Sequence, residues 1–178
     1  MDTLLKYNLG ADVTAFSTTR ISPQPISAEE IKAMGNYAAF NVTYYCGDNP
    51  QRVAKNKAWL CSELGVNENC LWLPRQTHTA NVLEIDEAFL NKEEEEQTQC
   101  LQEIDALITT LPHQCISIST ADCVPILLYD EKHHAIAAIH AGWRGTVQRI
   151  SQVCLEKMAN AFGTKANDCK ALIGPSIS

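Results

Sequence analysis

The second half of the chain carries the clearest pattern of apolar and polar positions. Residues 116–119 alternate between apolar and polar, residues 124–129 are nearly all apolar, and residues 135–139 are apolar again. Such runs, bounded by polar residues, predict three strands in close succession. Residues 130–134, which read Asp-Glu-Lys-His-His, have the length of a hairpin turn between the last two strands.

Helical signals lie in three places. Asn49-Pro50 begins a predicted helix that runs to about Leu64, where Gly65 provides a stop. Residues 27–30 indicate a brief helix start. The third predicted helix ends at Gly163, and its apolar positions recur at helical spacing. These positions are Val147, Ile150, Cys154, Met158 and Ala161.

Further strands are predicted at residues 13–18, 81–85, 106–109 and 171–173. The four glutamates at residues 93–96 are expected to form a solvated loop, because adjacent carboxylates point in different directions and cannot converge on a cation. Strands interspersed with helices, without a linker or internal repeat, predict one α+β domain with mixed sheets over residues 1–178.

The charge balance narrows the choice of partner. A net charge of −7 and a pI near 5.2, with no cluster of Lys and Arg, argue against nucleic acid or an anionic membrane, so a small molecule is the expected partner. No stretch approaches the ~18 apolar residues of a membrane span, and the first residues lack the features of a signal peptide. The eight cysteines are well below the ~8–10% of disulfide scaffolds. We therefore expect a reduced, cytoplasmic protein.

His78, Cys123 and His140 stand out as candidate metal ligands and catalytic residues. All three lie at the edges of predicted strands, where rigid scaffolds present reactive groups. Two imidazoles and a thiolate suit Zn²⁺, and three protein ligands leave a fourth position open for water, whose pKa then falls to about 7. Spacing alone leaves the alternatives open: Cys123 as a small buried hydrophobe, His140 as a core histidine, and His78 as an exposed loop residue.

Arg144 and Asp122 are candidates for substrate binding. Arg144 precedes the helix expected to start near Thr146, where free N–H groups favour an anion such as phosphate. The alternative is a surface arginine or one paired with Asp122. The other histidines are expected to face solvent, and the other cysteines show no metal-ligand spacing. These residues are His113, His133, His134, Cys46, Cys61, Cys70, Cys100, Cys115, Cys154 and Cys169.

Five motifs in a fixed order resemble the laccase-domain family, and the resemblance covers nearly the whole chain. They are Gln76-Thr77-His78, Asp105-Ala106-Leu107-Ile108-Thr109, Thr120-Ala121-Asp122-Cys123-Val124-Pro125, His140-Ala141-Gly142-Trp143-Arg144-Gly145 and Ile173-Gly174-Pro175. Members of this multicopper polyphenol oxidase-like family are described as purine nucleoside phosphorylases with adenosine deaminase and methylthioadenosine phosphorylase activities, and one branch as peptidoglycan editing factors.

The resemblance implies a four-layer α/β/β/α fold and a metal, usually zinc, on His78, Cys123 and His140. The sequence departs from the family at residues 21–27, which replace a Gly-Gly-Val-Ser step. Family members also continue beyond the Ile-Gly-Pro step, so we expect the single domain to be truncated at its C-terminus and the C-terminal part of the family fold to be missing.

The leading hypothesis is a zinc-dependent purine nucleoside phosphorylase, a monomer or homodimer, that takes a purine nucleoside and phosphate and also deaminates adenosine. The second is a metal-independent hydrolase in which Cys123 is the nucleophile and His78 or His140 its base. Copper-dependent phenol oxidation needs several clustered histidines, for which five in the chain are too few. A fourth protein ligand would instead indicate zinc as a structural clip.

Overall fold

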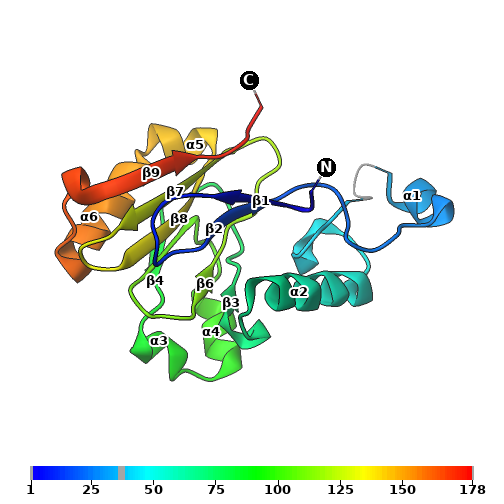
Figure 1. Cartoon of the computed structure of the whole chain (residues 1–178), viewed down its shortest axis with the longest axis horizontal. Helices are drawn as coiled ribbons and strands as arrows, with labels where there is room; N and C mark the ends of the chain where they lie inside the picture. Colours follow the sequence, from blue (N-terminus) through cyan, green and yellow to red (C-terminus); the bar gives the residue numbers. More distant parts are fainter. Residues whose placement is uncertain (1, 36–38, 178) are drawn as a thin grey trace. The chain divides into compact units, whose positions relative to one another are not determined.

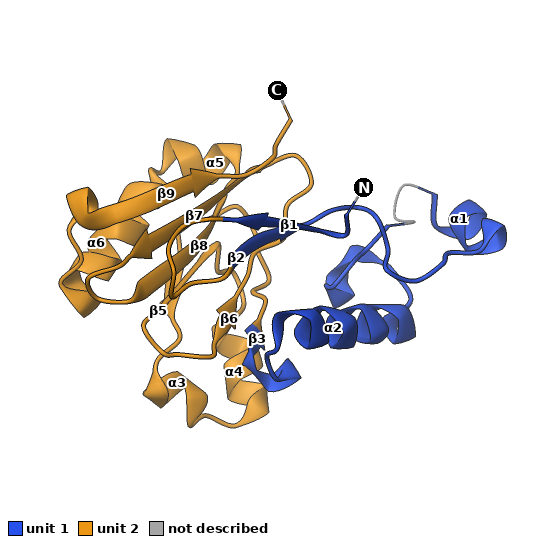
Figure 2. Ribbon diagram, viewed as in Figure 1, with its two compact units in different colours: residues 1–7, 15–71 blue, residues 8–14, 72–178 orange. Residues whose placement is uncertain are grey.

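A computed structural model describes residues 2–35 and 39–177, and its mixture of strands and helices (Figure 1) confirms the predicted α+β class. The chain forms two compact units (Figure 2). Unit 1 comprises Met1–Tyr7 with Ala15–Leu71, and unit 2 comprises Asn8–Thr14 with Trp72–Ser178. The single domain over residues 1–178 therefore stays a prediction.

Unit 1 contains a short hairpin and the predicted N-terminal helices. Its elements are β1 (Leu4–Tyr7), antiparallel to β2 (Ala15–Thr18), then α1 (Ala28–Met34), η2 (Tyr44–Cys46), α2 (Pro50–Leu64) and η3 (Glu68–Cys70). Ser27 and Glu30 form a capping box at α1. The Asn49 side chain caps α2, and Gly65 ends it in the left-handed conformation, as the sequence predicts.

Unit 2 is built on one five-stranded sheet of order β4-β5-β8-β7-β9. Strands β4 and β5 are parallel and every other neighbouring pair is antiparallel, which confirms a mixed sheet. Its elements are β3 (Leu71–Trp72, of which Trp72 belongs to the unit), β4 (Val82–Glu84), α3 (Glu87–Leu90), α4 (Glu94–Cys100), β5 (Ala106–Thr109), β6 (Cys115–Ile116), β7 (Val124–Asp130), β8 (Ala135–Ala141), α5 (Trp143–Val147), α6 (Ile150–Phe162), η4 (Ala166–Asp168) and β9 (Cys169–Ile173).

Both faces of this sheet are covered, because successive residues of a strand point to opposite sides. On one face Ile108 and Ile139 pack with Met158 of α6 in a fully buried cluster. On the other face Leu107 and Ala138 pack in a second buried cluster, whose other members are Trp72, Ile85, Phe89 and Ile116. Packing on both faces holds the strands in place. The side chains at the strand ends are therefore held on a rigid sheet.

The prediction that the four glutamates form a loop is wrong. Residues 94–96 form the first turn of α4, with Glu93 as its N-cap. Glutamate is a good helix former, and its charge is favourable beside the free N–H groups at a helix N-terminus. The residues remain exposed, in keeping with a solvated face.

The last predicted helix is interrupted. Helix α5 ends at Val147 and α6 begins at Ile150, because Arg149 takes the left-handed conformation with φ of 58°. The strand expected at residues 116–119 is also shorter and ends at Ile116. Among the helices of the described residues, none is both long and apolar enough to cross a membrane.

The turn between β7 and β8 is organised by a buried carboxylate. Asp130 is fully buried, and its Oδ1 accepts from the backbone N–H groups of Lys132 (3.0 Å) and His133 (3.3 Å). Its Oδ2 lies 2.6 Å from Nδ1 of His133, a residue that sequence reasoning expected to face solvent. Burial alone would raise the pKa of Asp130, but polar contacts with Thr164 and His133 outweigh it and lower this pKa.

Asp130→Asn should therefore destabilise the chain in a pH-dependent manner. A carboxyl group whose pKa falls on folding stabilises the folded state above its unfolded pKa of about 3.9 and loses that contribution as the pH falls through the folded value. We expect a loss of about 1–3 kcal/mol at pH 7, shrinking below pH ~4. Urea unfolding at several pH values measures this, and a loss that stays constant down to pH 3 would contradict it.

Candidate metal centre

Three strand ends meet at one edge of the sheet. Pro125 of β7 pairs with His140 of β8, so Cys123, two residues earlier, lies opposite Gly142. On the other side of β8, Ala106 pairs with Ile139, and the backbone N–H of His140 donates to the carbonyl of Asp105 (2.8 Å). The hairpin register thus brings Cys123 close to the end of the strand that carries His140.

His78 lies on the loop that precedes β4. The backbone N–H of Asp105 donates to the carbonyl of Asn81 (3.0 Å), which places this loop beside the start of β5. His78 has φ of 65°, an uncommon conformation for a residue with a side chain. The Gln76 side chain donates to the carbonyl of Ser119 and accepts from its N–H, both at 2.7 Å. Gln76 therefore ties the His78 loop to the loop that leads to Cys123.

The three side chains converge. One ligand atom from each of His78, Cys123 and His140 lies within 4.8 Å of the other two. Cys123 Sγ is 3.7 Å from His78 Nε2, and the two imidazole rings meet edge to face with centroids 4.9 Å apart. Tetrahedral zinc with ordinary Zn–N and Zn–S bonds separates such atoms by about 3.6 Å. His140 is buried, while His78 and Cys123 remain accessible to solvent.

Asp105 joins two of these residues and was missed as a functional residue. It is fully buried, and its Oδ1 lies 2.7 Å from His140 Nδ1 and 3.0 Å from the backbone N of His78. Its Oδ2 accepts from the N–H (2.8 Å) and hydroxyl (2.8 Å) of Thr79 and from the N–H of Thr77 (3.2 Å). The signals in the sequence are a charged residue directly before a buried strand and its place in the motif of residues 105–109.

These contacts keep Asp105 ionised. Burial would raise the pKa of Asp105, but the hydrogen bonds from His140, Thr79 and Thr77 outweigh it and lower that pKa to about 2. A carboxylate only accepts hydrogen bonds, so the Nδ1 of His140 is the donor in their contact. In the neutral imidazole, the Nε2 of His140 then keeps a lone pair for a metal.

Arg144 does not precede a helix at Thr146 as predicted, because α5 already begins at Trp143. Its guanidinium lies over the Trp143 ring, 5.2 Å from the centroid. Asp122 is exposed, and its carbonyl accepts from the N–H of Ile177 (3.3 Å). Among the ion pairs of the described residues none joins Arg144 to Asp122. Substrate binding by these two residues stays a prediction.

Within the part of the chain that the structure describes, the remaining histidines and cysteines form no second centre, and the three converging residues are the one group found that could hold a metal ion. His113 and His134 are exposed and all eight cysteines are free. Burial raises the pKa of Cys154 to about 12, so this thiol is unreactive at neutral pH.

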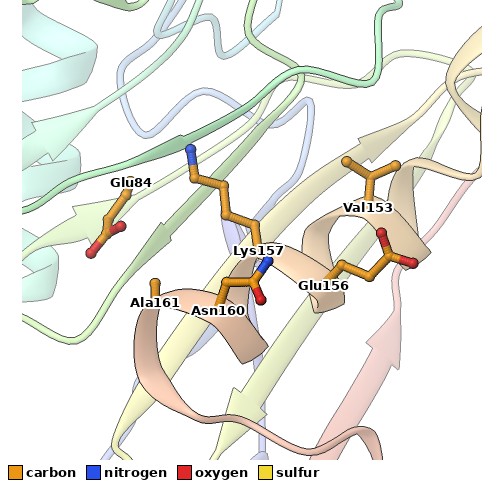
Figure 3. A pocket seen from close by; sticks show the side chains of 6 residues that line it. All are labelled: Glu84, Val153, Glu156, Lys157, Asn160 and Ala161. Carbon is orange, nitrogen blue, oxygen red and sulfur yellow. The ribbon is translucent and has the colours of Figure 1, made fainter.

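A surface groove of unit 2 lies apart from these residues, between α6 and β4 (Figure 3). Lys157 crosses from α6 to donate to the carbonyl of Val82 (2.8 Å). The lining residues are Glu84, Val153, Glu156, Lys157, Asn160 and Ala161. None of them belongs to the converging group, so the chemistry is expected at the sheet edge and not in this groove.

Two relatives resemble the chain over most of its length. A purine nucleoside phosphorylase of Bacteroides thetaiotaomicron is 49% identical over 144 residues, which cover 81% of this chain and 53% of the relative. Adenosine deaminase RL5 from an unknown prokaryotic organism is 40% identical over 165 residues, which cover 93% of this chain and 60% of the relative. The chain thus spans between about half and three fifths of the length of these relatives.

Solved structures confirm the fold. A Neisseria meningitidis protein of family DUF152 has a TM-score of 0.76 at 25% identity, over 99% of this chain and 64% of its own. The Bacillus licheniformis hypothetical protein YfiH has a TM-score of 0.70 at 24% identity, over 79% of this chain and 52% of its own. A family model described as multi-copper polyphenol oxidoreductase laccase matches residues 29–178. Since that match covers most of the chain, the protein belongs to this laccase-like family.

Proposed function

We propose that this chain is part of a zinc-dependent purine nucleoside phosphorylase that acts on adenosine and inosine, with methylthioadenosine as a further substrate and adenosine deamination as a second activity. The observation that carries the proposal is the convergence of His78, Cys123 and His140 at one sheet edge. Two relatives named purine nucleoside phosphorylase and adenosine deaminase support the choice of substrate.

His78, Cys123 and His140 would hold the zinc ion. A zinc ion bound by these three residues would supply Lewis-acid polarisation to a substrate at this site. The donor set fits zinc, for which imidazole nitrogen and thiolate sulfur are both common ligands. Copper redox chemistry of the multi-copper kind needs several metal sites, and the described residues offer a single candidate group.

In phosphorolysis a phosphate oxygen forms a bond to C1′ of the ribose while the bond from C1′ to the purine nitrogen breaks. The bond electrons leave with the base, which takes up a proton. We assign phosphate binding to Arg144, because a guanidinium matches phosphate oxygens. Asp105 is unsuited to donate the proton, since it is ionised and already accepts five hydrogen bonds. Asp122 has an exposed carboxyl group directly before Cys123, and along the chain it is the candidate proton donor nearest to a metal ligand.

The test incubates the zinc-loaded chain with inosine or adenosine, with and without phosphate, and separates the products by chromatography. Phosphorolysis gives free base and ribose 1-phosphate only when phosphate is present, whereas deamination turns adenosine into inosine without it. Removal of zinc with a chelator should stop both reactions. Failure to release base or ammonia with one zinc bound per chain would contradict the proposal.

A second candidate function is a metal-independent hydrolase, favoured by the 3.7 Å contact between Cys123 Sγ and His78 Nε2. It predicts rapid alkylation of Cys123 by iodoacetamide in the metal-free chain and activity that survives chelators. Activity that is lost with the metal and restored by zinc excludes it.

A further inference from the structure

We propose that Asp105 is a positioning residue that sets both histidines for metal binding before the metal arrives. It would do so by holding His140 in the tautomer protonated on Nδ1 and by fixing the backbone turn that carries His78. The inference rests on the metal-binding part of the proposed function and does not depend on the substrate.

The tautomer follows from the set of donors around one carboxylate. The five hydrogen bonds to Asp105 come from three backbone N–H groups, one hydroxyl and the His140 ring. The three backbone N–H groups and the Thr79 hydroxyl donate to both carboxylate oxygens, and these contacts favour the ionised form of the carboxyl group. A carboxylate that accepts all five contacts requires a hydrogen on His140 Nδ1, so in the neutral imidazole the lone pair lies on Nε2.

The backbone around His78 depends on the same carboxylate. The consecutive N–H groups of Thr77, His78 and Thr79 all point at Asp105, and the turn includes the positive φ of His78. Successive N–H groups in such a turn form a concave anion site, which the carboxylate occupies here. Without this carboxylate the three N–H groups lose their acceptor oxygens. The hydrogen bonds that compensate for the strained conformation of the turn are then lost.

Asp105→Asn keeps the shape of the side chain and removes half of its acceptors. The amide nitrogen must then face either the backbone N–H groups or His140 Nδ1. In the first case the turn of His78 loosens, and in the second His140 is driven to carry its hydrogen on Nε2, where it blocks ligation. Either outcome weakens the metal site without removing a ligand.

Asp130 provides a matched control. It is equally buried, its carboxylate accepts from two backbone N–H groups, and it contacts Nδ1 of a histidine, His133, at 2.6 Å. It lies at the opposite end of β7 from Cys123. Asp130→Asn should therefore impose a comparable loss of stability while it leaves the metal site intact.

The experiment combines zinc affinity with the histidine tautomer. Zinc affinity of the purified chain is measured by competition with a chelating dye, and ¹⁵N NMR of the metal-free chain reports which nitrogen of His140 is protonated. We expect Nδ1 in the unmodified chain, a loss of about 10–100-fold in zinc affinity for Asp105→Asn, and a change below about threefold for Asp130→Asn.

Three results would overturn the proposal. They are His140 protonated on Nε2 in the unmodified metal-free chain, unchanged zinc affinity in Asp105→Asn, and an equal loss of affinity in Asp130→Asn. The tautomer measurement needs no variant, so it decides the matter even if Asp105→Asn fails to fold. Because neither readout involves a nucleoside, an absence of phosphorolysis would count against the proposed enzyme activity and leave this inference standing.

Discussion

Cys123→Ser should yield a folded chain that purifies with little or no zinc. The thiolate is one of three converging ligands, and a neutral hydroxyl is a poor replacement for it. Loss of residues that merely support a ligand costs about 10–100-fold in metal affinity, so loss of the ligand itself should exceed that range. Zinc per chain after gel filtration measures the effect. Zinc-dependent activity should fall by the same factor or more.

Cys115→Ser is the control for this substitution. Cys115 is half-buried in β6 and its Sγ lies 3.6 Å from the hydroxyl of Ser117, so serine can keep the polar contact. The Cys115 variant should bind one zinc ion as tightly as the unmodified chain. If Cys123→Ser also retained one tightly bound zinc, the thiolate would not be a ligand and the three residues would not form the zinc site.

Gly142→Ala should disable the same site by adding a single methyl group. A Cβ at this position would lie 2.6 Å from His78 Cδ2 and 3.2 Å from Cys123 Sγ. The first distance is too short for carbon atoms, so the ring of His78 must move away from the other two ligands. Gly142 has φ of −71°, which alanine adopts readily, so the effect falls on the site and not on the backbone.

The expected result is a loss of zinc affinity of at least about 10-fold, comparable to the loss of a supporting residue, with a nearly unchanged unfolding transition. Gly163→Ala should lower the stability and leave zinc affinity unchanged. Gly163 has φ of 76°, and the nearest atom to an added Cβ would lie 3.8 Å away. The strain should cost about 1–2 kcal/mol. Normal zinc binding by Gly142→Ala would mean that the three ligands meet elsewhere or more loosely.

The hairpin that carries two of the ligands could be predicted from local sequence. Two apolar runs flank the polar residues 130–134, and this pattern specifies β7, β8 and their antiparallel pairing. Once paired, the strands bring the residue before β7 and the last residues of β8 together. The proximity of Cys123 to His140 is therefore a consequence of local pattern and strand geometry.

The place of His78 could not be predicted in the same way. It depends on the parallel pairing of β4 with β5, which joins segments separated by α3 and α4. Periodicity within a strand does not identify its partner at such a distance in the chain. The positive φ of His78 and the role of Asp105 are also invisible in sequence, because one carboxylate gathers the N–H groups of a loop more than 20 residues away. The break at Arg149 likewise has no signal in the apolar spacing.

The proposed function depends on a single metal held by two imidazoles and one thiolate with a position left open. X-ray absorption at the zinc edge of the chain loaded with one zinc ion tests it most directly. We expect two nitrogen neighbours at about 2.0–2.1 Å, one sulfur at about 2.3 Å, and one further light atom that exchanges when a nucleoside or phosphate is added. A zinc ion without a sulfur neighbour, or one closed by a fourth protein ligand, would contradict it.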